Sequence, residues 1–237
     1  MNTKLKFCEL FRDERLFSDL LNRCVLIGET VKRGTFWSIV LILAMFTVAN
    51  SVRAQSVSGS INGHDYVDLG LSVKWATCNV GASKPSDYGN YYAWGETSTK
   101  STYTEENSKT YGKKMVDIKG DGRYDVARAN WSGSWRIPTR EEMQELVDNC
   151  TWTWTIQGGH SGYRVTGPNG KSIFFPAAGF RTRNALSYTS EVGYFWTSIP
   201  DESNTQGAGC LRFNRLFLGN VGWDYRDSGF SVRPVTE

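Results

Sequence analysis

Apolar side chains recur with helical spacing between residues 139 and 150. The residues at i, i+3, i+4 and i+7 are Met143, Leu146, Val147 and Cys150. Thr139 stands where an N-cap residue belongs, and Glu142, three positions later, can complete a capping box with it. Because the positions between them are mostly acidic or polar, the pattern predicts a short amphipathic helix over residues 139–149 with one buried face.

Short runs of alternating or β-branched and aromatic residues predict strands after this helix. They cover residues 152–156, 163–166, 172–175, 192–198 and 209–214. The sequence Gly-Pro-Asn-Gly at 167–170 separates the second run from the third and indicates a hairpin turn. Many short strands beside one clear helix indicate an α+β fold.

The chain before the helix has a different pattern. Residues 66–77 read as two short strands around Gly70. Residues 95–130 are rich in Ser, Thr, Lys and Gly and carry few apolar side chains, which predicts a long loop.

Composition and charge narrow the class of protein. Of the 237 residues, 40% are hydrophobic and 14% aromatic, which indicates one folded domain rather than a disordered chain. Residues 1–54 contain 8 basic and 5 acidic residues, which leaves 19 of each sign for the remainder and places the net charge of +3 at the N-terminal end. A neutral domain gives no electrostatic argument for nucleic acid or an anionic membrane as partner.

Residues 36–49 form a largely apolar run of 14 residues that follows Lys32 and Arg33 and precedes Ala54. This arrangement is typical of a secretory signal peptide, so we expect residues 1–54 to be a leader with a long n-region, cleaved after Ala54. An uncleaved membrane anchor, which usually needs about 20 apolar residues, is the alternative. The length of the n-region also leaves open a start codon further downstream.

Five sequence blocks follow one another between residues 65 and 235. They are Val67–Ala76, Tyr91–Thr97, Trp135–Thr139 with the acidic helix after it, Phe175–Arg181 and Ser231–Val235. In this order they resemble the Fibrobacter succinogenes major paralogous domain family, which is common in secreted proteins of Bacteroidetes. The resemblance implies a C-type-lectin-like fold for residues 65–237, after a short polar lead-in over residues 55–64. In such a fold the first strand pairs with the last, which here implies that residues 66–77 pair with residues 230–235.

Three cysteines, Cys78, Cys150 and Cys210, follow the expected cleavage position. An exported protein can form disulfides, and Cys78 and Cys150 lie in blocks that resemble the family, so these two are the preferred pair. The alternative is that all three are buried thiols that pack as small hydrophobic side chains. Cys210 is expected to be buried in a strand without reactivity.

Two segments resemble calcium sites at first sight. The stretch Asp117–Asp125 carries three aspartates, but Lys119 and Arg128 stand where an EF-hand needs oxygen donors. Gly167-Pro168-Asn169 is similar to the Glu-Pro-Asn triplet of calcium-dependent lectins, but its first residue lacks the carboxylate. We therefore expect no metal site.

The sequence offers little for catalysis. His64 and His160 have no second ligand at zinc spacing, and Ser161 is not in a nucleophile-elbow pattern. Arg136–Glu142 is similar to a segment of the sulfatase-modifying formylglycine-generating enzymes. Their chemistry needs a close pair of thiols late in the fold, where this chain has only Cys210.

The C-terminal part of the chain, between Arg181 and Asp227, mixes aromatic side chains with hydrogen-bonding ones, as binding surfaces do. In C-type-lectin-like folds this part commonly forms the ligand face. The expected ligand-binding residues are Asn214, Arg215, Trp223, Asp224, Tyr225 and Arg226. Burial in the core is the alternative for Trp196 and Trp223, because large aromatic side chains are usually buried.

Together these observations predict a secreted, periplasmic or cell-surface module for recognition or adhesion. We expect a monomer that binds an extracellular protein or glycan without catalysis, cofactor, nucleic acid or membrane insertion of the mature chain. The alternatives are an enzyme on a formylglycine-generating-like scaffold and a structural subunit of a surface assembly.

Overall fold

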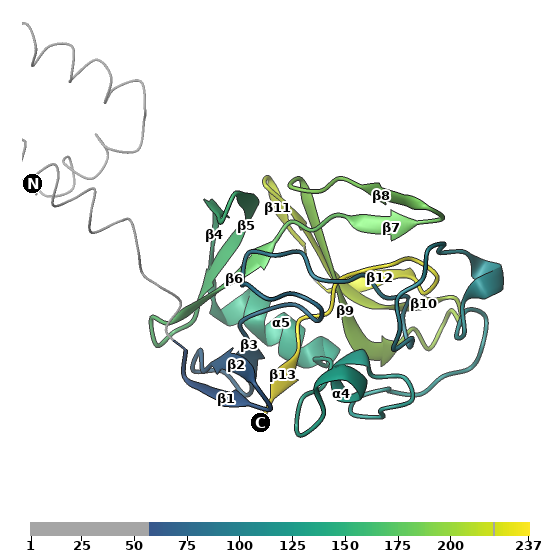
Figure 1. Ribbon diagram of the computed structural model, residues 1–237, viewed down its shortest axis with the longest axis horizontal. Helices are drawn as coiled ribbons and strands as arrows, with labels where there is room; N and C mark the ends of the chain where they lie inside the picture. The colour runs from purple at the N-terminus through teal and green to yellow at the C-terminus, as the bar shows by residue number, and fades with distance from the viewer. Residues whose placement is uncertain (1–56, 220) are drawn as a thin grey trace, which may run out of the picture. The chain divides into compact units, whose positions relative to one another are not determined.

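The computed structural model describes residues 57–219 and 221–237. The signal peptide expected over residues 1–54 lies outside these ranges. Within them, no helix has the length and apolar character needed to cross a membrane. The described residues belong to one compact unit, whose elements are drawn in Figure 1.

Helix α5 (Arg140–Asn149) begins at the expected capping box. Thr139 Oγ1 accepts a hydrogen bond from Glu142 N at 3.2 Å, and Glu142 Oε2 accepts one from Thr139 N at 2.9 Å. Two orphan amides of the first turn are thereby satisfied. The four residues of the predicted apolar face all contact the main core: Met143, Leu146, Val147 and Cys150. The amphipathic helix is confirmed.

Within the described residues, the strands pair antiparallel in four small sheets. The first sheet has the order β1 (Gly59–Ile61), β2 (His64–Val67), β3 (Lys74–Ala76) and β13 (Val235–Thr236). The second has β10 (Gly207–Asn214) at its centre, with β9 (Val192–Pro200) on one side and β11 (Phe217–Leu218) and β12 (Gly222–Tyr225) on the other. The third comprises β4 (Thr151–Gln157), β5 (His160–Thr166) and β6 (Ser172–Pro176), and β7 (Phe180–Thr182) pairs with β8 (Ala185–Ser187). With helix α5, these sheets confirm the α+β class.

The last strand of the domain pairs with a strand of the segment 66–77, as the resemblance implied, although that strand is the third of the domain and not the first. Strand β13 pairs with β3, with Val235 opposite Trp75 and Thr236 opposite Lys74. On its other side, Val235 exchanges two backbone hydrogen bonds with Arg136, at 2.9 and 3.1 Å. The two ends of the folded unit are therefore fixed to each other and to the segment that enters α5.

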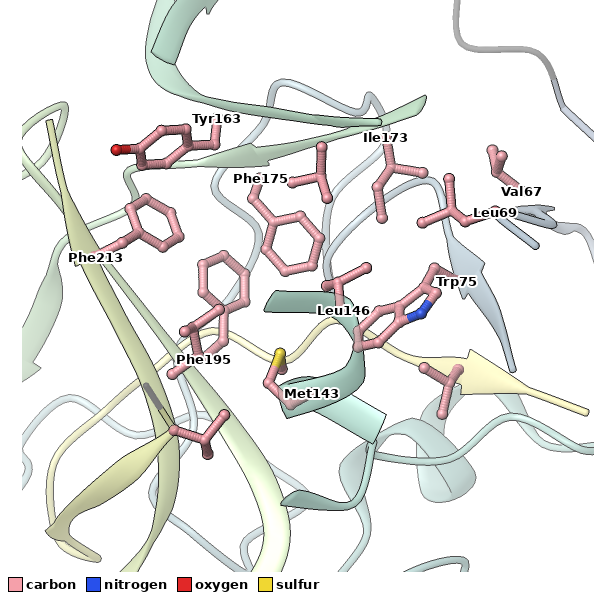
Figure 2. Packing of buried hydrophobic residues seen from close by; sticks show 14 of the residues in the cluster. Val67, Leu69, Trp75, Met143, Leu146, Tyr163, Ile173, Phe175, Phe195 and Phe213 are labelled. Atoms are coloured by element: carbon pink, nitrogen blue, oxygen red, sulfur yellow. The ribbon is translucent and has the colours of Figure 1, made fainter. Parts of the chain in front are cut away.

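Helix α5 packs between the sheets in the main hydrophobic core (Figure 2). Met143 and Leu146 contribute from the helix, and aromatic rings contribute from the strands around it. The rings of Trp75 and Phe195 approach Phe175 edge-on, at centroid distances of 6.0 and 4.8 Å, an arrangement that aromatic pairs favour. A second cluster lies around Trp94, Trp135, Trp196 and Phe230. Trp196 is thus a core residue.

The structure contains several short elements that the sequence pattern did not predict. The expected loop over 95–130 contains a 3₁₀ turn, η1 (Glu105–Asn107), and the short helix α4 (Val126–Trp131). The expected lead-in over 55–64 contains β1 and the start of β2. The hairpin β7–β8 and strand β12 were also not predicted. Each is six residues or shorter, too short for a periodicity to be recognised.

Two buried arginines lie in the sequence blocks that resemble the family, Arg136 in the third block and Arg233 in the last. Arg136 donates from Nη1 and Nη2 to the two carboxylate oxygens of Glu142, at 2.8 and 2.7 Å. Arg233 is completely buried and donates to Asn79 Oδ1 at 2.8 Å and to two backbone carbonyl oxygens. These charge-assisted hydrogen bonds offset the cost of burying a guanidinium, although Arg136 Nε has no partner among the described residues. These arginines therefore hold the scaffold together.

The cysteines differ from the preferred interpretation. Cys78, Cys150 and Cys210 are all free thiols, so the Cys78–Cys150 disulfide is not formed. Cys150 ends helix α5 and packs against the main core, whereas Cys78 accepts a hydrogen bond from Thr77 Oγ1. Cys210 is fully buried on strand β10 in the second cluster, as expected, whereas Cys78 and Cys150 are only partly buried.

Candidate functional site

Strand β12 presents two aromatic side chains to solvent. Trp223 is 40% exposed and Tyr225 is 55% exposed, while Asp224 between them is partly buried. A shallow hollow of about 310 Å³ lies beside them. Its lining residues are Asp201, Asn204, Gly207, Arg212, Trp223, Asp224 and Tyr225. Three of the six predicted site residues therefore come together in one hollow.

The indole of Trp223 is held on two sides. Strand β10 places Gly209 opposite Trp223, and a side chain at Gly209 would lie 3.6 Å from the ring. The guanidinium of Arg140, from the first turn of α5, lies 5.4 Å from the ring centroid. Arg140 Nη2 also donates to Val221 O at 3.0 Å and so fixes the residue that precedes β12. An aromatic ring that is held in advance costs little conformational entropy on binding.

An ion pair lies at the rim of the hollow. Arg212 Nη1 is 3.7 Å from Asp224 Oδ2. Both residues are brought to this rim by the pairing of β10 with β12, in which Cys210 lies opposite Gly222. Burial raises the pKa of Asp224, and the charge of Arg212 offsets part of this effect. The pair offers both a hydrogen-bond donor and an acceptor to a ligand.

Tyr225 borders a more acidic region. Its ring lies 6.4 Å from that of Tyr111, measured between centroids. Burial, together with the neighbouring carboxylate of Glu105, raises the pKa of Tyr111 to about 12. Burial also raises the pKa of Asp227. Tyr111 therefore keeps its hydroxyl proton at neutral pH and can donate a hydrogen bond.

Arg226 is a correction to the predicted site. Its side chain is only 1% exposed, and its guanidinium lies over the ring of Trp94, 4.6 Å from the centroid. Nε donates to Gly207 O at 2.6 Å, and Nη1 donates to Thr110 O at 3.2 Å and Lys113 O at 2.9 Å. Arg226 therefore anchors the end of β12 from the interior of the domain and is not accessible to a ligand.

Asn214 and Arg215 lie apart from the hollow. Asn214 ends β10, five residues beyond Gly209, which corresponds to roughly 17 Å along a strand. Its Oδ1 accepts hydrogen bonds from Leu216 N and Phe217 N, both at 2.8 Å, and so shapes the turn into β11. Arg215 is exposed in that turn. The structure does not bring these two residues together with Trp223.

Sequence reasoning missed three polar members of the hollow. Arg212 is the exposed residue between buried Leu211 and Phe213 on β10, so the alternation of that strand was an available signal. Asp201 and Asn204 shape the turn before β10: Asp201 Oδ1 accepts from Asn204 N at 3.2 Å. Only the pairing of β10 with β12 places them beside the aromatic residues.

The other candidate sites have structural roles. Asp125 is the N-cap of α4 and accepts hydrogen bonds from Ala127 N and Arg128 N. The ring of His64 stacks on Trp131 at a centroid distance of 3.8 Å, and His160 packs edge-on against Tyr88. Among residues 57–219 and 221–237 there is no group of three His, Cys, Asp or Glu side chains that could hold a metal ion.

The structure is therefore an α+β domain with a surface hollow lined by aromatic and polar residues. The model of the Lcl C-terminal domain family matches residues 66–236, and the chain belongs to this family, which is associated with Fibrobacter major paralogous domain proteins. No curated protein and no solved structure gives a significant match.

Proposed function

We propose that this protein is a secreted or cell-surface recognition module that binds an extracellular protein or glycan through the hollow beside β12. The observation that supports this proposal is that Trp223 and Tyr225 are exposed on a strand whose position is fixed. Arg140 and Gly209 lie beside the ring of Trp223, and the buried Arg226 anchors the end of the strand. Exposed aromatic side chains with matched hydrogen-bonding neighbours are frequent at recognition surfaces.

A C-type-lectin-like fold belongs to the same proposal. Its support is the pairing of β3 with β13, which joins the two ends of the domain, and helix α5, the longest helix of the described residues, which packs in the main core. The apolar segment at 36–49 supports export from the cytoplasm, because its length and basic flank fit a signal peptide.

We propose further that the module is not an enzyme. A formylglycine-generating-like reaction needs a reactive thiol pair, whereas Cys210 is fully buried and burial raises its pKa. A thiol becomes nucleophilic only as the thiolate. Thiol-dependent oxidation by the copper-loaded protein would favour the enzyme instead, and incorporation into surface filaments would favour a structural subunit.

The test is a screen of residues 55–237 on glycan and extracellular-protein arrays, followed by two matched variants. Trp223→Ala removes an anchor inside the hollow, and Phe217→Ala removes an aromatic ring that is 61% exposed outside it. Loss of one aromatic anchor typically costs about 2 kcal/mol, so Trp223→Ala should weaken binding roughly thirtyfold. Phe217→Ala should bind as the unchanged domain does. Equal binding by both variants would exclude the hollow as the site.

A further inference from the structure

Strand β4 is the outer strand of its sheet. The order of that sheet is β4–β5–β6, and in Figure 1 β4 lies at the margin of the domain. Within the described ranges, β5 is the only strand that pairs with it. All seven residues of β4 take part in that pairing, from Thr151 opposite Thr166 to Gln157 opposite His160. A straight edge of about 23 Å is therefore open to another strand.

This edge carries none of the features that usually prevent strand pairing. Protected edges are short, bulged, or marked by Lys, Pro or another charge. The sequence of β4 is TWTWTIQ, without charge, proline or irregular register. Threonine, tryptophan and isoleucine all favour strands. Such an edge is a template for a second strand.

The turn after β4 determines which backbone groups face outward. Gly158 and Gly159 connect β4 to β5 with φ of 57° and 85°, as in a two-residue type I′ turn. A turn of this kind closes on a hydrogen-bonded pair, here Gln157 and His160. Hydrogen bonding alternates along an antiparallel ladder, so the N–H and C=O groups that point away from β5 belong to Trp152, Trp154 and Ile156.

We propose that β4 pairs antiparallel with β4 of a second copy of this chain, with Trp154 opposite Trp154 on the two-fold axis. In this register Trp152 lies opposite Ile156, and Thr153 lies opposite Thr155. The outward groups of the three apolar residues then meet one another, which gives about six main-chain hydrogen bonds. No like charges oppose each other, because residues 151–157 are uncharged.

The apolar side chains of β4 are better matched by a second copy of β4 than by water. Ile156 is 69% exposed, and Trp152 and Trp154 are partly buried on the same face of the sheet. An antiparallel partner with a perpendicular two-fold axis keeps like faces together, so the second copy adds an equal apolar stripe beside the first. Aromatic and β-branched cross-strand pairs stabilise sheets. The β12 hollow belongs to another sheet, and edge pairing does not depend on it.

The test compares Ile156→Pro with Ile156→Thr in residues 55–237, by sedimentation velocity up to about 100 µM, because dimer stability depends on protomer concentration. Proline at 156 removes an outward N–H and leaves the ladder to β5 intact. Threonine keeps that N–H. We expect a dimer for the unchanged domain and for Ile156→Thr, and a dissociation constant roughly thirtyfold higher for Ile156→Pro, which loses two hydrogen bonds per dimer. A monomeric unchanged domain, or a proline variant that dimerises equally well, overturns β4 pairing.

A cross-linking experiment fixes the register without proline. Chains carrying Thr153→Cys are mixed with chains carrying Thr155→Cys under oxidised glutathione. In the proposed register the two positions form a non-hydrogen-bonded pair with Cα atoms about 4.5 Å apart, within the range that disulfides span. We expect a disulfide-linked dimer in the mixture and not with either variant alone, which also controls for the native cysteines. Equal cross-linking in all three samples overturns this register.

Discussion

Replacing Arg226 tests whether this side chain stabilises the fold or contacts a ligand. The guanidinium donates three hydrogen bonds to backbone carbonyl oxygens, which tie the end of β12 to the start of β10 and to residues 110–113. Arg226→Ala leaves these three acceptors without their donor and opens a void beside Trp94. We therefore expect a large loss of stability from a side chain that sequence patterns assign to a binding surface.

The magnitude follows from the contacts. Hydrogen bonds to a charged group contribute about 1.5–3 kcal/mol each, and burial of the guanidinium costs several kcal/mol, which leaves a net loss of about 3 kcal/mol for Arg226→Ala. For a domain of this size, that loss lowers the melting temperature by about 6–12 °C. The melting temperature of Arg226→Lys should lie between those of the unchanged domain and Arg226→Ala. The compact ammonium of lysine cannot reach three divergent acceptors as the planar guanidinium does.

Thermal and urea unfolding of residues 55–237 measure this loss, and hydrogen exchange locates it. Protection should fall first in the loop around Thr110 and Lys113, which Arg226 holds. Arg215→Ala is the matched control, since Arg215 is exposed and surface substitutions usually change stability by less than about 0.5 kcal/mol. If Arg226→Ala and Arg215→Ala have the same melting temperature, the anchoring role of Arg226 is refuted.

Three further outcomes are expected. Trp223→Ala should change the melting temperature little, because its ring is 40% exposed; a fall of many degrees would assign Trp223 to the core. Burial opposes ionisation of Glu142, but hydrogen bonds from Arg136 outweigh it and lower its pKa. Its contribution to stability is therefore complete above the unfolded pKa of about 4.5 and is lost as pH falls through the folded pKa; Glu142→Gln should flatten that acid limb in urea unfolding. Burial raises the pKa of Cys150 to about 11 and also raises that of Cys210, so Ellman's reagent at pH 7 should label both slowly until the domain unfolds, and rapid labelling of the native protein would contradict this.

Short-range patterns were sufficient for much of the fold. The capping box of Thr139 and Glu142 and the apolar spacing after it are set by residues within two helical turns, and α5 begins and ends where they predict. The alternation over residues 152–156 and the turn at 167–170 likewise depend on neighbours in the chain, and β4, β5 and β6 follow them. Such features require no knowledge of the remainder of the molecule.

Only the tertiary structure decided which polar residues form the site. Arg226 carries the same local signal as its exposed neighbours, but one of its acceptors, Thr110 O, is 116 residues away in the chain. Asp224 meets Arg212 because β12 pairs with β10. Period and propensity act over a few residues, whereas the burial of a charge is decided by the segments that the topology packs against it. The sequence by itself therefore determined α5 and the longer strands, whereas the packing of the chain determined the short elements and the surface that the paired strands present.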